Sequence, residues 1–427
     1  MKKRLLRYSS LLLAMSMLII LVMPAQARHG ATPFDILYAD LRLDDESDGL
    51  AEGMLTIVMR TGIPESRVIA FWADETGPLR EYDALAPITV QEGINRIEMK
   101  SGTVIPENAQ RLMLFQEGRD GLSYENVEVA LPENAVGATE QEPLYEFQVI
   151  SDTHIRADWA GDNNYNFQRA LTDISWVSPE SKGIIINGDM TNRGLSVEYE
   201  ILMQTAEQVP GLPNLYMGIG NHEYFSVDSY QEAERLFLQT AALPDGTHPE
   251  RAYYDFYLGS AHFVFLAPDC SSGLGDGVVW CGEEQLAWLE ETLSRDGSDV
   301  QRFVFLHEAI ENTVSGSFPE QEWGSYQDDG VLLEILEASD NTVLFTSHTH
   351  WTLNDPDTLF QNGELSILNT AAVAYLSSSE REAAGENIPG SQGYYVRVYD
   401  SYIEVFGRDF ITGRYLPSAM FRLPLGK

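Results

Sequence analysis

Short runs of apolar residues that alternate with polar ones fill the chain from residue 33 to about residue 132. Val127, Val129 and Leu131, for example, occupy every second position, and a period of two is typical of a half-buried strand. The pattern predicts a small all-β sandwich of immunoglobulin or fibronectin type over residues 33–132. The next stretch, LPENAVGATEQEPLY, has no periodicity and predicts a linker over residues 133–144.

From residue 145 onward, apolar runs alternate with helical segments. Leu286, Leu289 and Leu293 in one segment show the i, i+3, i+7 spacing of a helix that packs on one face. Strand and helix in repeated alternation indicate an α/β core, which we expect over residues 145–427. The expected buried strands are YEFQVI, GIIIN, LYMGIG, HFVFLA, RFVFL and TVLFT.

The first residues have the three parts of a secretory signal peptide. MKKR opens the chain, the apolar run LLLAMSMLIILVM follows, and Ala25-x-Ala27 fits a cleavage site. This run is shorter than the ~20 apolar residues that span a bilayer. We therefore expect a leader over residues 1–27, cleavage after Ala27, and a secreted chain without a membrane anchor.

The two cysteines, Cys270 and Cys281, flank the Gly-rich stretch SSGLGDGVVW. A disulfide between them is allowed outside the cell, and two free buried cysteines are the alternative. Two ligands do not make a structural zinc site, so zinc binding by this pair alone is not expected.

Acidic residues dominate the charge of the chain, whose formal net value is −38. A surface this acidic repels the phosphate backbone of nucleic acids at long range, which argues against general nucleic-acid binding. The hydrophobic content of 44% lies in the globular range.

Five of the apolar runs end in residues that can bind a metal ion. In open α/β sheets, ligands bind at the carboxyl ends of the strands, so these residues are expected to converge. On an extended strand, two histidines one residue apart would point to the same side. The candidates are Asp152 and His154, Asp189, Asn221 and His222, His307, and finally the pair His348 and His350.

Carboxylates and imidazoles in roughly equal number suit Zn, Fe or Mn better than Ca or Mg. This many ligands indicates two ions, about 3.5 to 4 Å apart, that share a carboxylate and activate a water molecule. We expect Asp189 to be the shared carboxylate, because the neighbouring Gly188 lets the backbone come close. His222 is then free for acid chemistry.

In order and type these motifs resemble the calcineurin-like metallophosphoesterases, over residues 145–427. The resemblance implies a four-layer α/β/β/α sandwich and a centre of two divalent or mixed-valence ions. It implies attack by a metal-bound hydroxide on phosphorus, with His222 protonating the leaving oxygen or steadying the transition state. The motifs are Asp152-x-His154, Gly188-Asp189, Gly220-Asn221-His222-Glu223, His307 and His348-x-His350. The implied ligands are Asp152, His154 and His350 for one ion, Asn221, His307 and His348 for the other, and Asp189 for both.

The stretch GDMTNRG departs from the family pattern at Asn192, where many members have a second aspartate. Asn192 can accept a hydrogen bond from His222 through its amide oxygen but cannot stabilise an imidazolium by charge. Arg193 matches an arginine that touches phosphate in the protein-phosphatase branch, and a plain surface arginine is the equal alternative.

The leading hypothesis is a secreted, metal-dependent phosphoric ester hydrolase that acts on small or polymeric phosphate mono- or diesters. The alternative is an extracellular binding protein, in which the β-sandwich recognises a cell-surface polymer and the metal centre is structural or degenerate. A one-zinc amide hydrolase is disfavoured, because seven candidate ligands exceed the three that a catalytic zinc uses.

Overall fold

The computed structural model describes most of the chain between residues 34 and 426. The stretches that it does not describe within these limits are 45–48, 101, 119–120, 124, 132–141, 159–160, 227–228, 269–277, 280, 322–324, 327–329 and 379–386. The predicted leader, its cleavage site, most of the predicted linker and Cys270 therefore lie outside the described residues, whereas Cys281 is buried. Among the described residues, no helix is long and apolar enough to cross a membrane.

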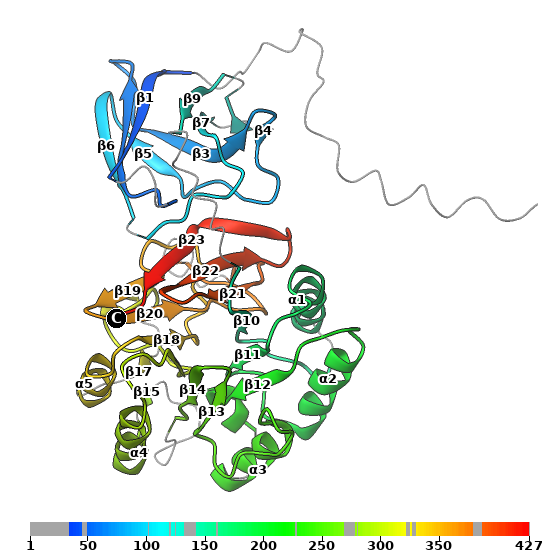
Figure 1. Cartoon of the computed structure of the whole chain (residues 1–427). Coiled ribbons are helices and arrows are strands. Elements are labelled where there is room, and N and C mark those ends of the chain that lie inside the picture. Colours follow the sequence, from blue (N-terminus) through cyan, green and yellow to red (C-terminus); the bar gives the residue numbers. More distant parts are fainter. Residues whose placement is uncertain are drawn as a thin grey trace, which may run out of the picture.

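The N-terminal part consists of two antiparallel sheets (Figure 1). One has the order β1-β2-β6, and the other has the order β4-β3-β7-β8, with β5 paired to β3 and β9 to β7. Ile57 of the first sheet and Trp72 of the second belong to one apolar core. That these strands form a separate sandwich domain with limits at 33 and 132 stays a prediction. The strands are β1 (Ile36–Leu43), β2 (Gly53–Met59), β3 (Ser66–Asp74), β4 (Gly77–Pro78), β5 (Ile88–Val90), β6 (Gly93–Met99), β7 (Arg111–Gly118), β8 (Gly121–Leu122) and β9 (Val127–Ala130).

Residues 145–426 contain two six-stranded mixed sheets (Figure 1). In the first, β10 pairs in parallel with β11 and β11 with β12, whereas the C-terminal strands are antiparallel. In the second, four central strands are parallel and both edge strands are antiparallel. The first sheet has the order β12 (Leu215–Gly218), β11 (Ile184–Asn187), β10 (Tyr145–Ile150), β21 (Gln392–Val398), β22 (Tyr402–Asp409), β23 (Arg414–Pro424). The second has the order β13 (Tyr254–Leu258), β14 (Ala261–Phe265), β16 (Arg302–Phe305), β18 (Thr342–Thr346), β20 (Leu365–Asn369), β19 (Leu359–Asn362). A separate pair is β15 (Val278–Val279) with β17 (Ser325–Tyr326).

The two sheets pack on each other, and helices cover their outer faces (Figure 1). Between the sheets, the ring of Phe147 lies 5.1 Å from that of Phe263 and 4.8 Å from that of Phe303. Because side chains alternate along a strand, Val264 and Val304 point the other way and join a core under α4 and α5. The expected α/β class is confirmed. The helices are α1 (Asn163–Val177), α2 (Ser196–Glu207), α3 (Tyr230–Thr240), α4 (Glu283–Ser294) and α5 (Val331–Glu337), with short 3₁₀ turns η1 (Asn221–Tyr224) and η2 (Pro319–Gln321).

The N-terminal part lies against the edge strand β23 (Figure 1). The backbone N–H of Tyr415 donates to the carbonyl of Glu81 at 2.8 Å, and the N–H of Asp83 donates back to Tyr415 at 2.9 Å. Further along the strand, the N–H of Arg422 donates to the carbonyl of Gly102 at 2.8 Å. Loops of the N-terminal part thus occupy the outer edge of β23 at two places.

His262 on β14 is buried in a charged network. Its Nδ1 lies 2.8 Å from a carboxylate oxygen of Asp296, and its Nε2 lies 3.0 Å from one of Asp255. Arg302 pairs with the same Asp296 oxygen at 3.2 Å, and the Tyr257 ring stacks on the imidazole. Burial by itself lowers the pKa of His262, but the two carboxylates raise it above its usual value.

This network should make the stability of the fold depend on pH through His262. A histidine whose folded pKa exceeds its unfolded value adds stability that is complete below about pH 6.5 and is lost as pH rises through the folded pKa. We expect His262→Gln to lower the free energy of unfolding by about 3 kcal/mol at low pH, because a buried ion pair is broken. The loss should be clearly smaller at high pH.

Urea titrations of both proteins near pH 6 and near pH 9 measure this difference. His248→Gln is the control, because His248 is exposed. Equal destabilisation by His262→Gln at both pH values would contradict the charged state of His262.

Candidate metal centre

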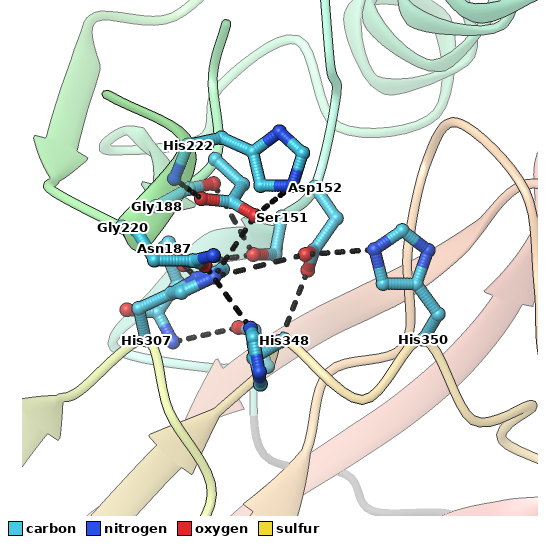
Figure 2. A network of polar contacts seen from close by, with 12 residues as sticks. Ser151, Asp152, Asn187, Gly188, Gly220, His222, His307, His348 and His350 are labelled. Carbon is cyan, nitrogen blue, oxygen red and sulfur yellow. Dashed lines mark hydrogen bonds and ion pairs between the residues drawn. The ribbon is translucent and has the colours of Figure 1, made fainter. Parts of the chain in front are cut away.

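All seven predicted metal ligands lie in the loops that follow β10, β11, β12, β16 and β18. Figure 2 shows four of them, Asp152, His307, His348 and His350, pointing toward one another. Three groups of side chains bring their ligand atoms within 4.8 Å of one another. The groups are Asp152, His154 and His350; Asp189, His307 and His348; and His154, Asp189 and His222.

Asp152, His154 and His350 form the first group, and all three are buried. The Nε2 atoms of the two histidines lie 3.0 Å apart, and an Asp152 oxygen lies 3.1 Å from that of His350 and 3.8 Å from that of His154. His350 directs Nδ1 to the carbonyl of Tyr375 at 3.0 Å, so its Nε2 faces the other two ligands. Two imidazole nitrogens and a carboxylate oxygen this close suit a first-row metal ion.

The second group lies on the other side of Asp189. Nε2 of His307 is 3.2 Å from Oδ2 of Asp189, and its Nδ1 donates to the carbonyl of Asn187 at 2.7 Å (Figure 2). Nδ1 of His348 lies 3.1 Å from the amide oxygen of Asn221. Asn221 therefore adds an oxygen beside this group, as the sequence predicts for the second ion.

Asp189 occupies the position between the two groups. Its Oδ2 lies 3.2 Å from Nε2 of His307, 3.8 Å from that of His154 and 4.0 Å from that of His222. One carboxylate thus faces ligands of both groups, which is the geometry that a bridging ligand requires.

Burial and neighbouring charges set the protonation of the ligands. Burial lowers the pKa of His154 to about 3 and that of His348 to about 4, so both rings are neutral and able to bind a cation. Burial by itself raises the pKa of Asp152, but His350 and His307 lower it to about 2. Burial lowers the pKa of His307, but Asp189 and Asp152 raise it well above its usual value. Since a metal ion replaces this proton, metal uptake should release protons.

Five of the seven predicted ligands have a left-handed backbone conformation. The φ angles are 50° for Asp152, 42° for His154, 49° for Asp189, 67° for His348 and 59° for His350. Residues with a Cβ atom rarely adopt such angles, and the surrounding structure must hold them there. This concentration of strained backbone marks the edge of the sheets as a functional site.

The expectation that His348 and His350 share one face of a strand is wrong. Strand β18 ends at Thr346, and both histidines lie in the loop that follows. The loop turns between them, so His350 joins the first group and His348 the second. Each histidine of the pair therefore belongs to a different ligand group.

Gly188 and Gly220 allow the backbone to approach the ligands. A Cβ atom on Gly188 would lie 2.4 Å from Nδ1 of His307, and one on Gly220 would lie 2.4 Å from Oδ1 of Asp189. Since real Cβ atoms do not come this close to other atoms, any larger residue at either position would displace a ligand.

Glu223 lies behind the ligands and is fully buried. Its carboxylate accepts hydrogen bonds from the N–H groups of Asp189, Thr191 and Gly220 at 2.9 to 3.0 Å, and from the Thr191 hydroxyl at 2.8 Å. Burial and the charge of Asp189 raise the pKa of Glu223, whereas the hydrogen bonds to its oxygens favour the charged form. Glu223 therefore fixes the loop of Asp189 relative to the loop of Asn221.

Replacing Glu223 with glutamine should weaken metal binding without removing a ligand. The amide keeps the shape but presents a donor to N–H groups, so some of these lose their acceptor. We expect the metal affinity to fall about 10- to 100-fold and the free energy of unfolding to fall by about 1 to 3 kcal/mol. Calorimetric titration with Mn²⁺ tests this, with exposed Glu200→Gln as the control. Unchanged affinity would refute the positioning role of Glu223.

His222 is oriented by the main chain of the loop that carries Asn192 and Arg193. Its Nδ1 donates to the backbone carbonyl of Asn192 at 2.8 Å, so the contact differs from the expected one through the amide oxygen. Nε2 then faces Asp189. Arg193 is exposed, and its Nε donates to the hydroxyl of Ser226 at 3.1 Å.

Sequence reasoning missed Asn187, which joins the two sheets beneath the site. Its amide nitrogen donates to the carbonyls of Leu306 and Phe345 at 3.1 and 3.0 Å. A polar residue at the end of the buried run GIIIN was the available signal. Glu308, which directly follows His307, is also buried, and neither of its carboxylate oxygens has a hydrogen-bond partner among the described residues. Burial raises the pKa of Glu308 to about 7.

The family model for calcineurin-like phosphoesterases matches residues 146–352. A probable glycerophosphodiester phosphodiesterase of Arcobacter nitrofigilis is 27% identical over 165 residues, which are 37% of this chain and 55% of that protein. The chain thus spans about half the length of this curated relative.

Solved structures of low sequence identity were also found. Purple acid phosphatase PPD1 from yellow lupin is 12% identical with a TM-score of 0.45, covering 85% of this chain and 71% of that one. Vps29 from Entamoeba histolytica in complex with zinc is 12% identical with a TM-score of 0.30, covering 66% of this chain and 99% of that one.

The region matched by the family model starts in β10 and ends two residues after His350. It therefore includes every loop that contributes a predicted ligand. Through residues 146–352, the chain belongs to the calcineurin-like metallophosphoesterase superfamily.

Proposed function

We propose that the protein hydrolyses phosphate mono- or diesters with two bound metal ions, Mn, Zn or Fe. The observation that supports this most directly is the position of Asp189 between two ligand groups. Two cations would supply an activated water and neutralise charge on the phosphate. The proposed ligands are Asp152, His154 and His350 for one ion, Asn221, His307 and His348 for the other, and Asp189 for both.

Hydrogen bonds behind the ligands direct their Nε2 atoms to the centre. The Nδ1 atoms of His307 and His350 contact the carbonyls of Asn187 and Tyr375, and a carbonyl can only accept. The Nε2 atoms are therefore left to bind metal, and the ring orientations are set before metal binds.

His222 is the proposed acid that protonates the leaving oxygen. Its Nδ1 proton is held by the carbonyl of Asn192, which orients the ring so that Nε2 faces the centre. The His222 side chain is 23% exposed, so a substrate can reach it. A positioned acid of this kind contributes typically about 10²- to 10⁴-fold to the rate.

Diesters belong among the proposed substrates, because the Arcobacter nitrofigilis relative is named a probable glycerophosphodiester phosphodiesterase. We further propose that the protein acts outside the cell, on the basis of the predicted leader over residues 1–27. The N-terminal strands would then be placed to contact a phosphoester polymer or a cell-surface polymer.

Metal reconstitution tests the proposed function. The protein is stripped with a chelator, loaded with Mn²⁺, Zn²⁺ or Fe²⁺, and assayed with para-nitrophenyl phosphate, bis(para-nitrophenyl) phosphate and a glycerophosphodiester. We expect hydrolysis only after loading, with two ions per chain by mass spectrometry. One ion at full loading would contradict the dinuclear centre. Two bound ions without hydrolysis of any ester would favour the extracellular binding protein instead.

A further inference from the structure

Four rings form a row at the candidate metal centre. The ring of Phe225 stacks on His222 with centroids 4.0 Å apart and planes 30° apart. The row continues from His222 to His154, whose ring centroids lie 4.4 Å apart, and from His154 to Tyr375, whose centroids lie 5.8 Å apart. The proposed reaction uses the two histidines but gives no role to the Phe225 ring.

Phe225 is exposed although it lies beside the proposed acid. Its side chain is 41% exposed, and it follows the 3₁₀ turn η1 that carries His222. Single exposed apolar residues are common on protein surfaces, so exposure alone indicates nothing. The informative feature is that one face of this ring is fixed against His222.

Backbone contacts hold Phe225 in place relative to His222. The N–H of Phe225 donates to the carbonyl of His222 at 3.3 Å. The next residue, Ser226, donates its N–H to the carbonyl of Arg193 at 3.0 Å and accepts from the Arg193 side chain. Both ends of this short segment are thus attached to the loops that carry the site.

The position of the leaving group follows from the role of His222. If Nε2 of His222 protonates the leaving oxygen, that oxygen must lie within about 3 Å of it. A group that is bonded to this oxygen and directed away from the buried ligands would lie beside the exposed ring of Phe225, which stacks on His222. A flat aromatic group in this position can stack on the ring or meet its edge, whereas a saturated group of the same size fits it less closely.

We propose that Phe225 is a specificity-determining residue that contacts the leaving group and favours phosphoesters whose leaving alcohol carries a flat aromatic ring. This inference rests on the proposed phosphoesterase function. The expected preference is modest, about threefold to tenfold in kcat/KM, which is the usual range for one aromatic pair.

A matched pair of esters tests the inference with fully loaded protein. Benzyl phosphate and cyclohexylmethyl phosphate have alcohols of similar size and similar leaving ability, and they differ in the flatness of the ring. We expect Phe225→Leu to reduce the benzyl to cyclohexylmethyl ratio of kcat/KM about threefold to tenfold, mainly through KM. Phe225→Tyr, which keeps the ring, should preserve the ratio.

The outcomes separate this inference from the proposed function. If the wild-type protein with two ions hydrolyses no phosphate mono- or diester, the proposed function fails. If it hydrolyses both esters and Phe225→Leu lowers kcat/KM equally for both, with unchanged metal content, only the leaving-group role is refuted. An unchanged ratio with unchanged rates refutes it as well.

Discussion

Replacing Asp189 with asparagine should abolish hydrolysis and reduce the metal content below two ions per chain. The amide has the shape of the carboxylate but lacks the charge that holds two cations, and Oδ2 faces histidines of both ligand groups. Changes to groups that only support a ligand already cost about 10- to 100-fold, so we expect the loss of activity to exceed about a hundredfold. Assays and metal analysis at equal protein concentration measure both effects.

The Asp189→Asn result has two controls. Glu200→Gln also replaces a carboxylate with an amide, on the exposed face of α2, and should change neither the activity nor the metal content. Unfolding of the metal-free proteins shows whether the fold survives, and we expect Asp189→Asn to be less stable but still folded, because the buried pair of Asp189 with His307 at 3.2 Å is broken. Retention of two ions by an active Asp189→Asn protein would rule out the bridging role.

Replacing His222 with glutamine should slow turnover and leave both ions bound. Loss of a positioned acid should lower kcat by about 10²- to 10⁴-fold for alkyl esters, whose leaving oxygen needs a proton. The loss should be much smaller for para-nitrophenyl esters, since nitrophenolate leaves without protonation. Steady-state kinetics with alkyl and para-nitrophenyl esters measure the change in kcat, and metal analysis measures the number of ions bound per chain.

His248→Gln is the matched control for His222. Nδ1 of His248 also pairs with a backbone carbonyl, that of Ala241 at 2.6 Å, but His248 belongs to none of the ligand groups found among the described residues. If the His222 variant loses a metal ion, then the group of His154, Asp189 and His222 is itself a metal site, and the division of roles proposed here is wrong.

The sequence predicts the strands and the set of residues near the centre because both follow from local patterns. The run TVLFT coincides with β18, and YEFQVI coincides with β10. Polar residues directly after such runs lie at the carboxyl ends of parallel strands, so Asp152, Asp189 and His307 converge without knowledge of any loop.

The geometry within the centre could not be predicted, since it depends on loop conformation and on distant backbone atoms. An extended chain would place His348 and His350 on one side, whereas left-handed turns at both residues separate them. The carbonyls that orient His222 and His350 come from Asn192 and Tyr375, and a carbonyl group leaves no signal in a sequence. The orientation of these side chains therefore depends on the backbone conformation, which the sequence pattern does not reveal.

Strand β20 was missed as well, and with it the loop that closes one side of the centre. Leu365–Asn369 is short and has no helix before it, so the strand and helix alternation did not indicate it. The loop after it is fixed by the N–H of Val373 to Ser151 and by that of Ala374 to Asp152, each at 3.0 Å. These contacts bring Tyr375 to the ligands.

The contact between the N-terminal loops and β23 has a consequence for any shortened form of the protein. A chain that starts near residue 145 would lack the loops around Glu81 and Gly102, and the N–H groups of Tyr415 and Arg422 would lose their acceptors. Unpaired strand edges recruit strands from other molecules. Residues 145–426 alone would thus be prone to self-association and precipitation, because the loops that cover this edge of β23 would be missing.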